Sequence, residues 1–76
     1  MSFTDFLENN GWKEKQSSVE YIKGNWVVIF DTGSWMEIGT IKNPRVFDVP
    51  VPDESKMQWT LNLIEHLCKT DEKIKN

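Results

Sequence analysis

The sequence has little of three features that mark large classes of protein: cysteine, long hydrophobic runs and excess positive charge. Its 76 residues include one cysteine, Cys68, so a disulfide within the chain cannot form and the disulfide-stapled secreted domains are excluded. No apolar run approaches the ~20 residues of a membrane-spanning helix. The first six residues lack the basic and apolar regions of a secretory signal. We therefore expect a soluble cytoplasmic protein with no membrane partner.

The charge balance is acidic. Nine Lys and Arg residues against twelve Asp and Glu residues give a net charge of −3. A protein that binds DNA or RNA neutralises phosphates with basic side chains, and this chain has no excess of them. Direct binding of nucleic acid is therefore not expected.

The chain is short but rich in aromatic residues. A domain of this size buries only ~60% of its unfolded surface, and four Trp, four Phe and one Tyr supply the material for its core. We expect residues 1–70 to form a single small α+β domain and residues 71–76 to be a frayed C-terminal tail.

Helical patterns occur at both ends of the chain. Ser2 is placed to cap a first helix over about residues 3–10, and Gly11 is placed to end it. Asp53 or Ser55 is placed to cap a second helix. Spacing at 100° per residue gives that helix one apolar stripe, formed by Met57, Leu61, Ile64 and Cys68.

Between the helices the pattern predicts a four-stranded antiparallel meander, and hence an α-β-β-β-β-α order. Gly24 and Asn25 form a two-residue hairpin signal between strands at 18–23 and 26–31. Further strands are expected at 35–41 and about 45–49. Pairing Lys23 with Trp26 puts Tyr21 opposite Val28 on the core face. The same register puts four apolar residues on the other face: Ile22, Val27, Ile29 and Trp35.

The string Asp31-Thr32-Gly33-Ser34 follows an apolar strand. It resembles the D-T-G-S signature of the pepsin and retroviral aspartic protease family. That resemblance implies a dimeric aspartic hydrolase with Asp31 as its catalytic acid. The family also carries an apolar-apolar-glycine motif well downstream, whereas the nearest match here, Ile38-Gly39, comes early. The alternative is a β-turn, because these four residue types are common in turns and a strand resumes at Trp35.

Metal and thiol chemistry have few candidate residues. His66 and Cys68 are two positions apart on a helix, so they point about 200° apart and cannot bind one ion together. We expect no metal site and no cofactor. The carboxylates Glu20, Asp31 and Glu37 share the non-core face of the sheet. They either form a patch that binds a cation or mimics phosphates, or they solvate the face.

Two apolar groups remain after the core is assigned. One is the sheet group Ile22, Val27, Ile29 and Trp35, and the other is Trp59 and Leu63 on the second helix. The first helix is too short to cover both, and an uncovered apolar patch with a Trp is typical of an interface. We therefore expect a non-enzymatic interaction module that binds a protein or a second copy of itself. Size and charge suggest an acidic regulator or inhibitor of a nucleic-acid-handling complex, of the phage or mobile-element type.

Overall fold

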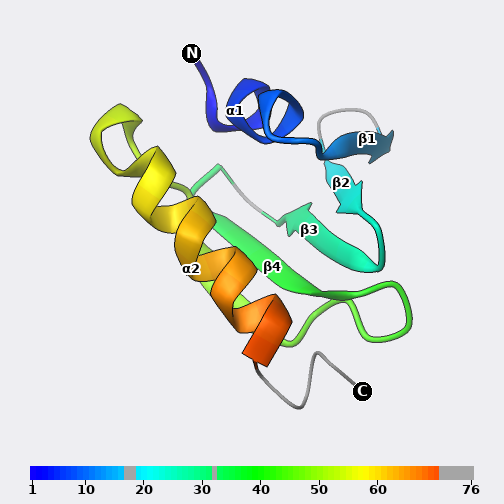
Figure 1. The fold of residues 1–76 in the computed structure, drawn as a ribbon. Coiled ribbons are helices and arrows are strands. Elements are labelled where there is room, and N and C mark those ends of the chain that lie inside the picture. Colours follow the sequence, from blue (N-terminus) through cyan, green and yellow to red (C-terminus); the bar gives the residue numbers. More distant parts are fainter. Residues whose placement is uncertain (17–18, 32, 71–76) are drawn as a thin grey trace.

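The computed structural model describes residues 1–16, 19–31 and 33–70. Within these residues, two helices and five strands follow one another, with a 3-10 turn before the second helix (Figure 1). The elements are α1 (Phe3–Asn9), β1 (Lys13–Gln16), β2 (Glu20–Lys23), β3 (Trp26–Phe30), β4 (Trp35–Thr40), β5 (Phe47–Pro50), η1 (Glu54–Lys56) and α2 (Met57–Thr70). The expected tail at 71–76 lies outside the described residues.

The strands form one antiparallel sheet in the order β1-β2-β3-β4-β5, and both helices lie on the same side of it. The core lies between these two layers. It is formed by Phe3, Leu7, Trp12, Tyr21, Val28, Met36, Ile38, Val49, Met57, Leu61, Ile64 and Cys68. The α+β class with an antiparallel sheet and a helix near each end is confirmed. No helix within the described residues is long and apolar enough to cross a membrane.

The predicted number of four strands is wrong, because Lys13–Gln16 forms an additional edge strand. All four residues of β1 are exposed, and their sequence, KEKQ, has no apolar alternation. The strand pairs with β2 through Lys13 opposite Ile22 and Glu14 opposite Tyr21. Backbone pairing therefore holds β1 in place, and lysines on an edge strand discourage further pairing. Sequence patterns predict strands from the burial of alternate side chains, and no side chain of β1 is buried.

The predicted start and end of α1 are confirmed. The Ser2 side chain accepts a hydrogen bond from the Asp5 amide, and the Asp5 carboxylate accepts one from the Ser2 amide. At the other end Gly11 has a φ of 92°, which favours glycine. The amide of Trp12 then donates to the Leu7 carbonyl at 3.0 Å, which completes a Schellman ending and turns the buried indole back onto the helix.

The predicted hairpin register is also confirmed. Gly24 has a φ of 61°, and Lys23 pairs with Trp26, Tyr21 with Val28 and Ile22 with Val27. In the next hairpin, Met36 pairs with Phe30 and also with Val49, so its side chain enters the core from the middle of the sheet. These registers place alternate residues of β2–β5 on opposite faces.

The second helix begins in two stages. Asp53 caps the 3-10 turn, with its carboxylate accepting from the Ser55 amide at 3.0 Å, and α2 continues from Met57. The expected apolar stripe is buried, with Thr60 beside it. Lys23 Nζ lies 3.1 Å from Glu65 Oε2, which ties the end of β2 to the last part of α2.

Candidate binding surface on the open face of the sheet

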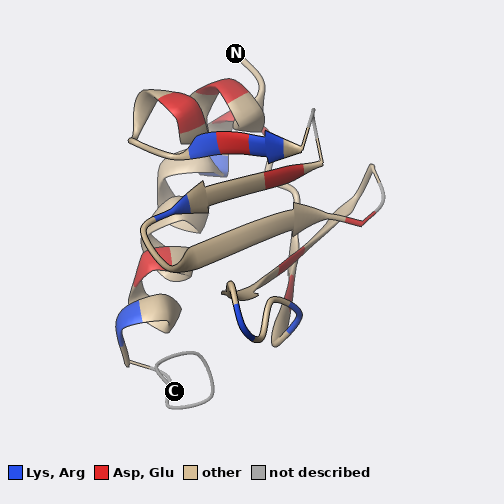
Figure 2. Ribbon diagram, turned by 90° about the vertical axis from the view of Figure 1, so that its right-hand side faces the viewer, with Lys and Arg blue, Asp and Glu red and all other residues tan. Residues whose placement is uncertain are grey.

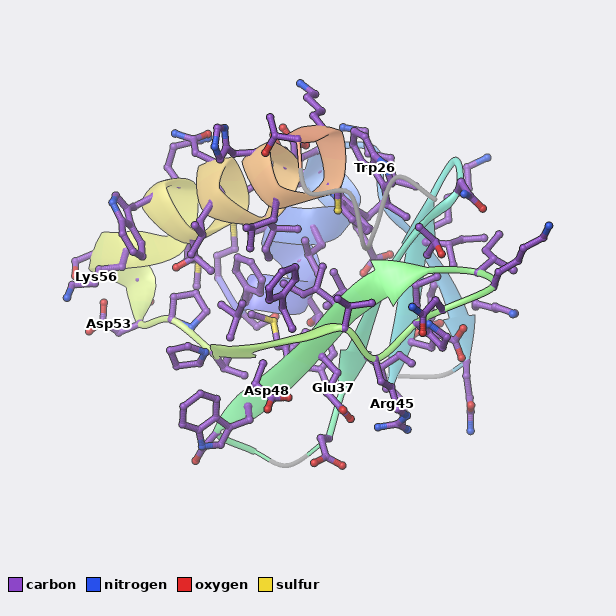
Figure 3. The ribbon with its side chains drawn as sticks, turned by 90° about the horizontal axis from the view of Figure 1, so that it is seen from below. Trp26, Glu37, Arg45, Asp48, Asp53 and Lys56 are labelled. Carbon is purple, nitrogen blue, oxygen red and sulfur yellow. The ribbon has the colours of Figure 1, made fainter. Side chains whose placement is uncertain are left out.

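One face of the sheet is covered by neither helix, and we call it the outer face. Figure 3 shows Glu37, Arg45 and Asp48 pointing away from the helices on this side. The strand registers place the following side chains there: Glu20 and Ile22 from β2, Val27 and Ile29 from β3, Trp35 and Glu37 from β4, and Asp48 and Pro50 from β5. The four apolar residues expected to share this face do so.

The centre of the outer face is nevertheless closed by the chain itself. Val27 is 1% exposed, and its partner on β4 is Gly39. The loop after β4 passes over that glycine, because a Cβ there would lie 2.7 Å from the carbonyl carbon of Pro44. The Thr40 amide donates to the Asn43 carbonyl at 3.0 Å, which holds the loop in this position. Val27 is thus covered within the monomer.

Ile29 is covered in a different way. It is 8% exposed and lies between Glu20 on β2 and Glu37 on β4. Each glutamate has a cationic partner: Lys15 Nζ lies 3.5 Å from Glu20, and Arg45 forms an ion pair with Glu37. The hydrocarbon stems of such paired side chains shield apolar neighbours from water. Both glutamate side chains are largely buried themselves, at 19% and 17% exposed.

Trp35 is the most exposed of the four apolar residues predicted on this face, at 48% exposed, whereas Ile22 is half-buried. Trp35 begins β4 and pairs with Pro50, while Asp31 lies across the preceding hairpin and its amide donates to the Trp35 carbonyl at 3.1 Å. On the same face, Asp48 lies two residues before Pro50 on β5, and Glu37 lies two residues after Trp35 on β4. We call Asp31, Trp35, Glu37, Asp48 and Pro50 the Trp35 surface.

The charges of the outer face are unevenly distributed. Lys13 and Lys15 lie on β1 at one edge, whereas the acidic positions of β4 and β5 lie toward the other (Figure 2). Asp31 and Asp48 are exposed, and neither takes part in an ion pair within the described parts of the chain. The Trp35 surface therefore combines an open indole with two unneutralised carboxylates.

The second predicted apolar group, Trp59 and Leu63, lies on α2 and has different surroundings from the Trp35 surface. Trp59 is 65% exposed and Leu63 is half-buried, so only the tryptophan is open. Trp59, Ser55 and Lys56 line a shallow hollow of about 350 Å³ at the start of the helix. The nearby Gln58 and Asn62 side chains hydrogen-bond to each other at 2.9 Å. This site offers an isolated aromatic ring on a polar helix face.

The D-T-G-S string forms the connection between two antiparallel strands. Asp31 is exposed at the end of β3, Gly33 and Ser34 are also exposed, and β4 begins directly afterwards. Thr32, which the protease resemblance assigns to the supporting loop, lies outside the described residues. The β-turn interpretation includes position 32 and so stays a prediction.

His66 and Cys68 lie on different sides of α2, as their spacing predicts. His66 is exposed, whereas Cys68 is 2% exposed. Burial, and secondarily the negative charge of Glu65, raises the pKa of the Cys68 thiol to about 12. The described residues contain no group of three or more His, Cys, Asp or Glu side chains placed to hold a metal ion. The thiol is thus a protonated core group at neutral pH.

Sequence reasoning missed what covers the outer face. The close approach at Gly39 leaves no local signal, because a glycine in a strand also marks a bulge or a bend. The ion pair between Arg45 and Glu37 was not predicted either. No protein-family model, curated protein or solved structure matches this chain.

Proposed function

We propose that the protein is a small interaction module that binds a protein partner through the Trp35 surface. One observation carries this proposal: Trp35 is 48% exposed on a sheet face that neither helix covers. Tryptophans at the centre of an interface often contribute much of the binding energy. Val27 and Ile29 on the same face are buried, whereas Trp35 keeps about half of its surface open beside exposed polar residues. Exposed apolar surface rimmed by polar residues marks protein interaction sites.

The proposal favours Trp35 over Trp59 because of its surroundings. Trp35 has Glu37, Asp48 and Pro50 on neighbouring positions of paired strands, which form a rigid platform, and Asp31 lies just beyond the end of β3. Trp59 stands at the start of a helix beside Lys56 and two neutral amides that hydrogen-bond to each other, with no carboxylate lining its hollow among the described residues. The acidic character of the Trp35 surface suits a partner that presents basic side chains, such as the nucleic-acid-binding surface of another protein.

Affinity capture with three forms of the full chain tests this proposal: the wild type, Trp35→Ala and Trp59→Ala. We expect Trp35→Ala to weaken capture of the partner by at least ~2 kcal/mol, or about thirtyfold, and Trp59→Ala to leave it unchanged. The reverse pattern would move the interface to α2. Sedimentation of the purified wild type shows whether the partner is a second copy of this chain or a different protein. Only self-association gives a dimer in the purified sample.

The aspartic hydrolase hypothesis makes a different prediction for Asp31. A hydrolase that depends on the Asp31 carboxylate loses all activity in Asp31→Asn. An interaction module keeps most of its affinity, because an exposed ion pair contributes about 0.2–1 kcal/mol. The single variant therefore separates the two function classes.

A further inference from the structure

We propose that the Trp35 surface binds an arginine-rich segment of its partner, with one guanidinium group stacked on the indole of Trp35 and paired with Asp31 or Asp48. This inference rests on the proposed function and specifies the chemistry of the partner. It commits to a basic peptide segment as the occupant of the surface.

Charge complementarity is the first argument. Of the four carboxylates of the outer face, Glu20 and Glu37 already have cationic partners in the chain. Asp31 and Asp48 form no ion pair within the described ranges, and they are the two that flank Trp35. The local charge beside the exposed indole is therefore negative, although three basic residues, Lys13, Lys15 and Arg45, lie elsewhere on the same face. A cation from a partner would complete the neutralisation.

Geometry favours a single side chain that contacts both ring and carboxylate. Asp48 is the diagonal neighbour of Trp35 across the β4–β5 pair, and diagonal neighbours in a sheet are ~7–8 Å apart. A cation within ~6 Å of an indole centroid is attracted by the ring. A group placed over the indole is thus within reach of a carboxylate from a neighbouring strand.

The planar guanidinium fits this arrangement better than an ammonium group does. Arginine stacks flat on aromatic rings and donates two parallel hydrogen bonds to one carboxylate. Lysine presents a compact and strongly hydrated charge that gains less from stacking. We therefore expect the surface to prefer arginine over lysine at equal net charge.

Titration of the isotope-labelled full chain with a short oligo-arginine peptide, followed by NMR, tests the inference. We expect saturable shifts centred on the Trp35 indole N–H and the Asp48 amide, with the Trp59 indole unmoved. Oligo-lysine should bind about threefold to tenfold more weakly, and Trp35→Ala should weaken oligo-arginine binding by a similar factor. Added salt should weaken all of these interactions.

A charge-matched pair of variants separates a specific site from general attraction to an acidic protein. Asp31→Asn with Asp48→Asn removes two charges at the surface, and Glu8→Gln with Glu54→Gln removes two exposed charges on the helical side. The first pair should weaken binding by about fourfold or more, and the second should change it by less than twofold. Equal effects from both pairs, or shifts centred away from Trp35, would overturn the inference.

These experiments distinguish failure of the arginine-binding inference from failure of the proposed function. If a native partner is captured through Trp35 but oligo-arginine does not bind there, the arginine chemistry is wrong and the interface stands. If oligo-arginine binds at Trp35 but the native partner contacts another face, the chemistry of the surface stands and the proposed function is wrong.

Discussion

The carbonyl group of Asn43 packs directly against the α-carbon of Gly39, so position 39 has no room for a side chain. This contact brings the loop after β4 onto the outer face beside Val27. The loop thus performs within the monomer the covering role that the sequence left to a helix or to a partner. Of the four apolar residues predicted on this face, Trp35 remains the most exposed.

Gly39→Ala should therefore be strongly destabilising. The added Cβ would lie 2.8 Å from the Pro44 carbonyl oxygen and closer still to Asn43, so backbone must move. We expect a loss of at least ~1–3 kcal/mol in the free energy of unfolding, measured by urea denaturation. Gly33→Ala is the matched control, because no atom lies within 4 Å of its added Cβ. Equal stability of the two variants would show that the loop does not hold this position.

Gly24 tests the backbone requirement of the first hairpin separately from packing. Its φ is +61° and nothing lies within 4 Å of an added Cβ, so a substitution there acts through strain alone. Gly24→Val should lose ~1–3 kcal/mol of stability, since β-branched residues avoid this conformation. Gly24→Asn should lose less, because asparagine tolerates it better. Thermal melts that rank Val and Asn equally would contradict the turn geometry.

Gly24 and Gly39 differ in how well their structural roles could be predicted from the sequence. The Gly24-Asn25 turn and the alternation of Tyr21 with Ile22 were sufficient to set the β2–β3 register, because turn chemistry and burial agree there. The apolar stripe of α2 was predictable for the same reason. Gly39 carries no comparable local signal, since its role depends on a loop four residues further along the chain.

The candidate site was only partly predictable for a related reason. The alternation of residues along the strands correctly put Trp35, Val27 and Ile29 on one face of the sheet. Alternation predicts the face on which a side chain lies, but not how exposed that side chain is to solvent. Val27 and Ile29 are covered by the loop and by ion-paired side chains, and those contacts are tertiary. The missed strand β1 has the same explanation, because its residues are all exposed and its place in the sheet depends on pairing with β2, which is a tertiary contact.

Trp35 and Trp12 should respond very differently to truncation. Trp12 is 1% exposed in the core, so Trp12→Ala should lower the free energy of unfolding by ~3–5 kcal/mol. Trp35 is 48% exposed, and Trp35→Ala should lower it by less than about 1 kcal/mol. Urea denaturation of both variants measures this contrast. A loss at Trp35 as large as that at Trp12 would make it a structural residue.

The Cys68 thiol gives a prediction for pH. Its pKa is raised from 9.0 to about 12 in the folded chain, mainly by burial, so the thiol is neutral when folded and ionises more readily when unfolded. Its contribution to stability is complete below pH 9 and is lost as the pH rises toward 12. The wild type should therefore lose stability more steeply over this range than Cys68→Ala. Parallel slopes would contradict the buried position of the thiol.

Site-specific photo-crosslinking from the Trp35 surface shows directly whether a partner binds there. An aromatic photo-reactive residue replaces Trp35 in one sample and Trp59 in another, and each is irradiated with the native partner mixture. We expect a discrete adduct from position 35 that is lost when excess unlabelled wild type competes, and no adduct from position 59. An adduct from position 59 alone would contradict this expectation.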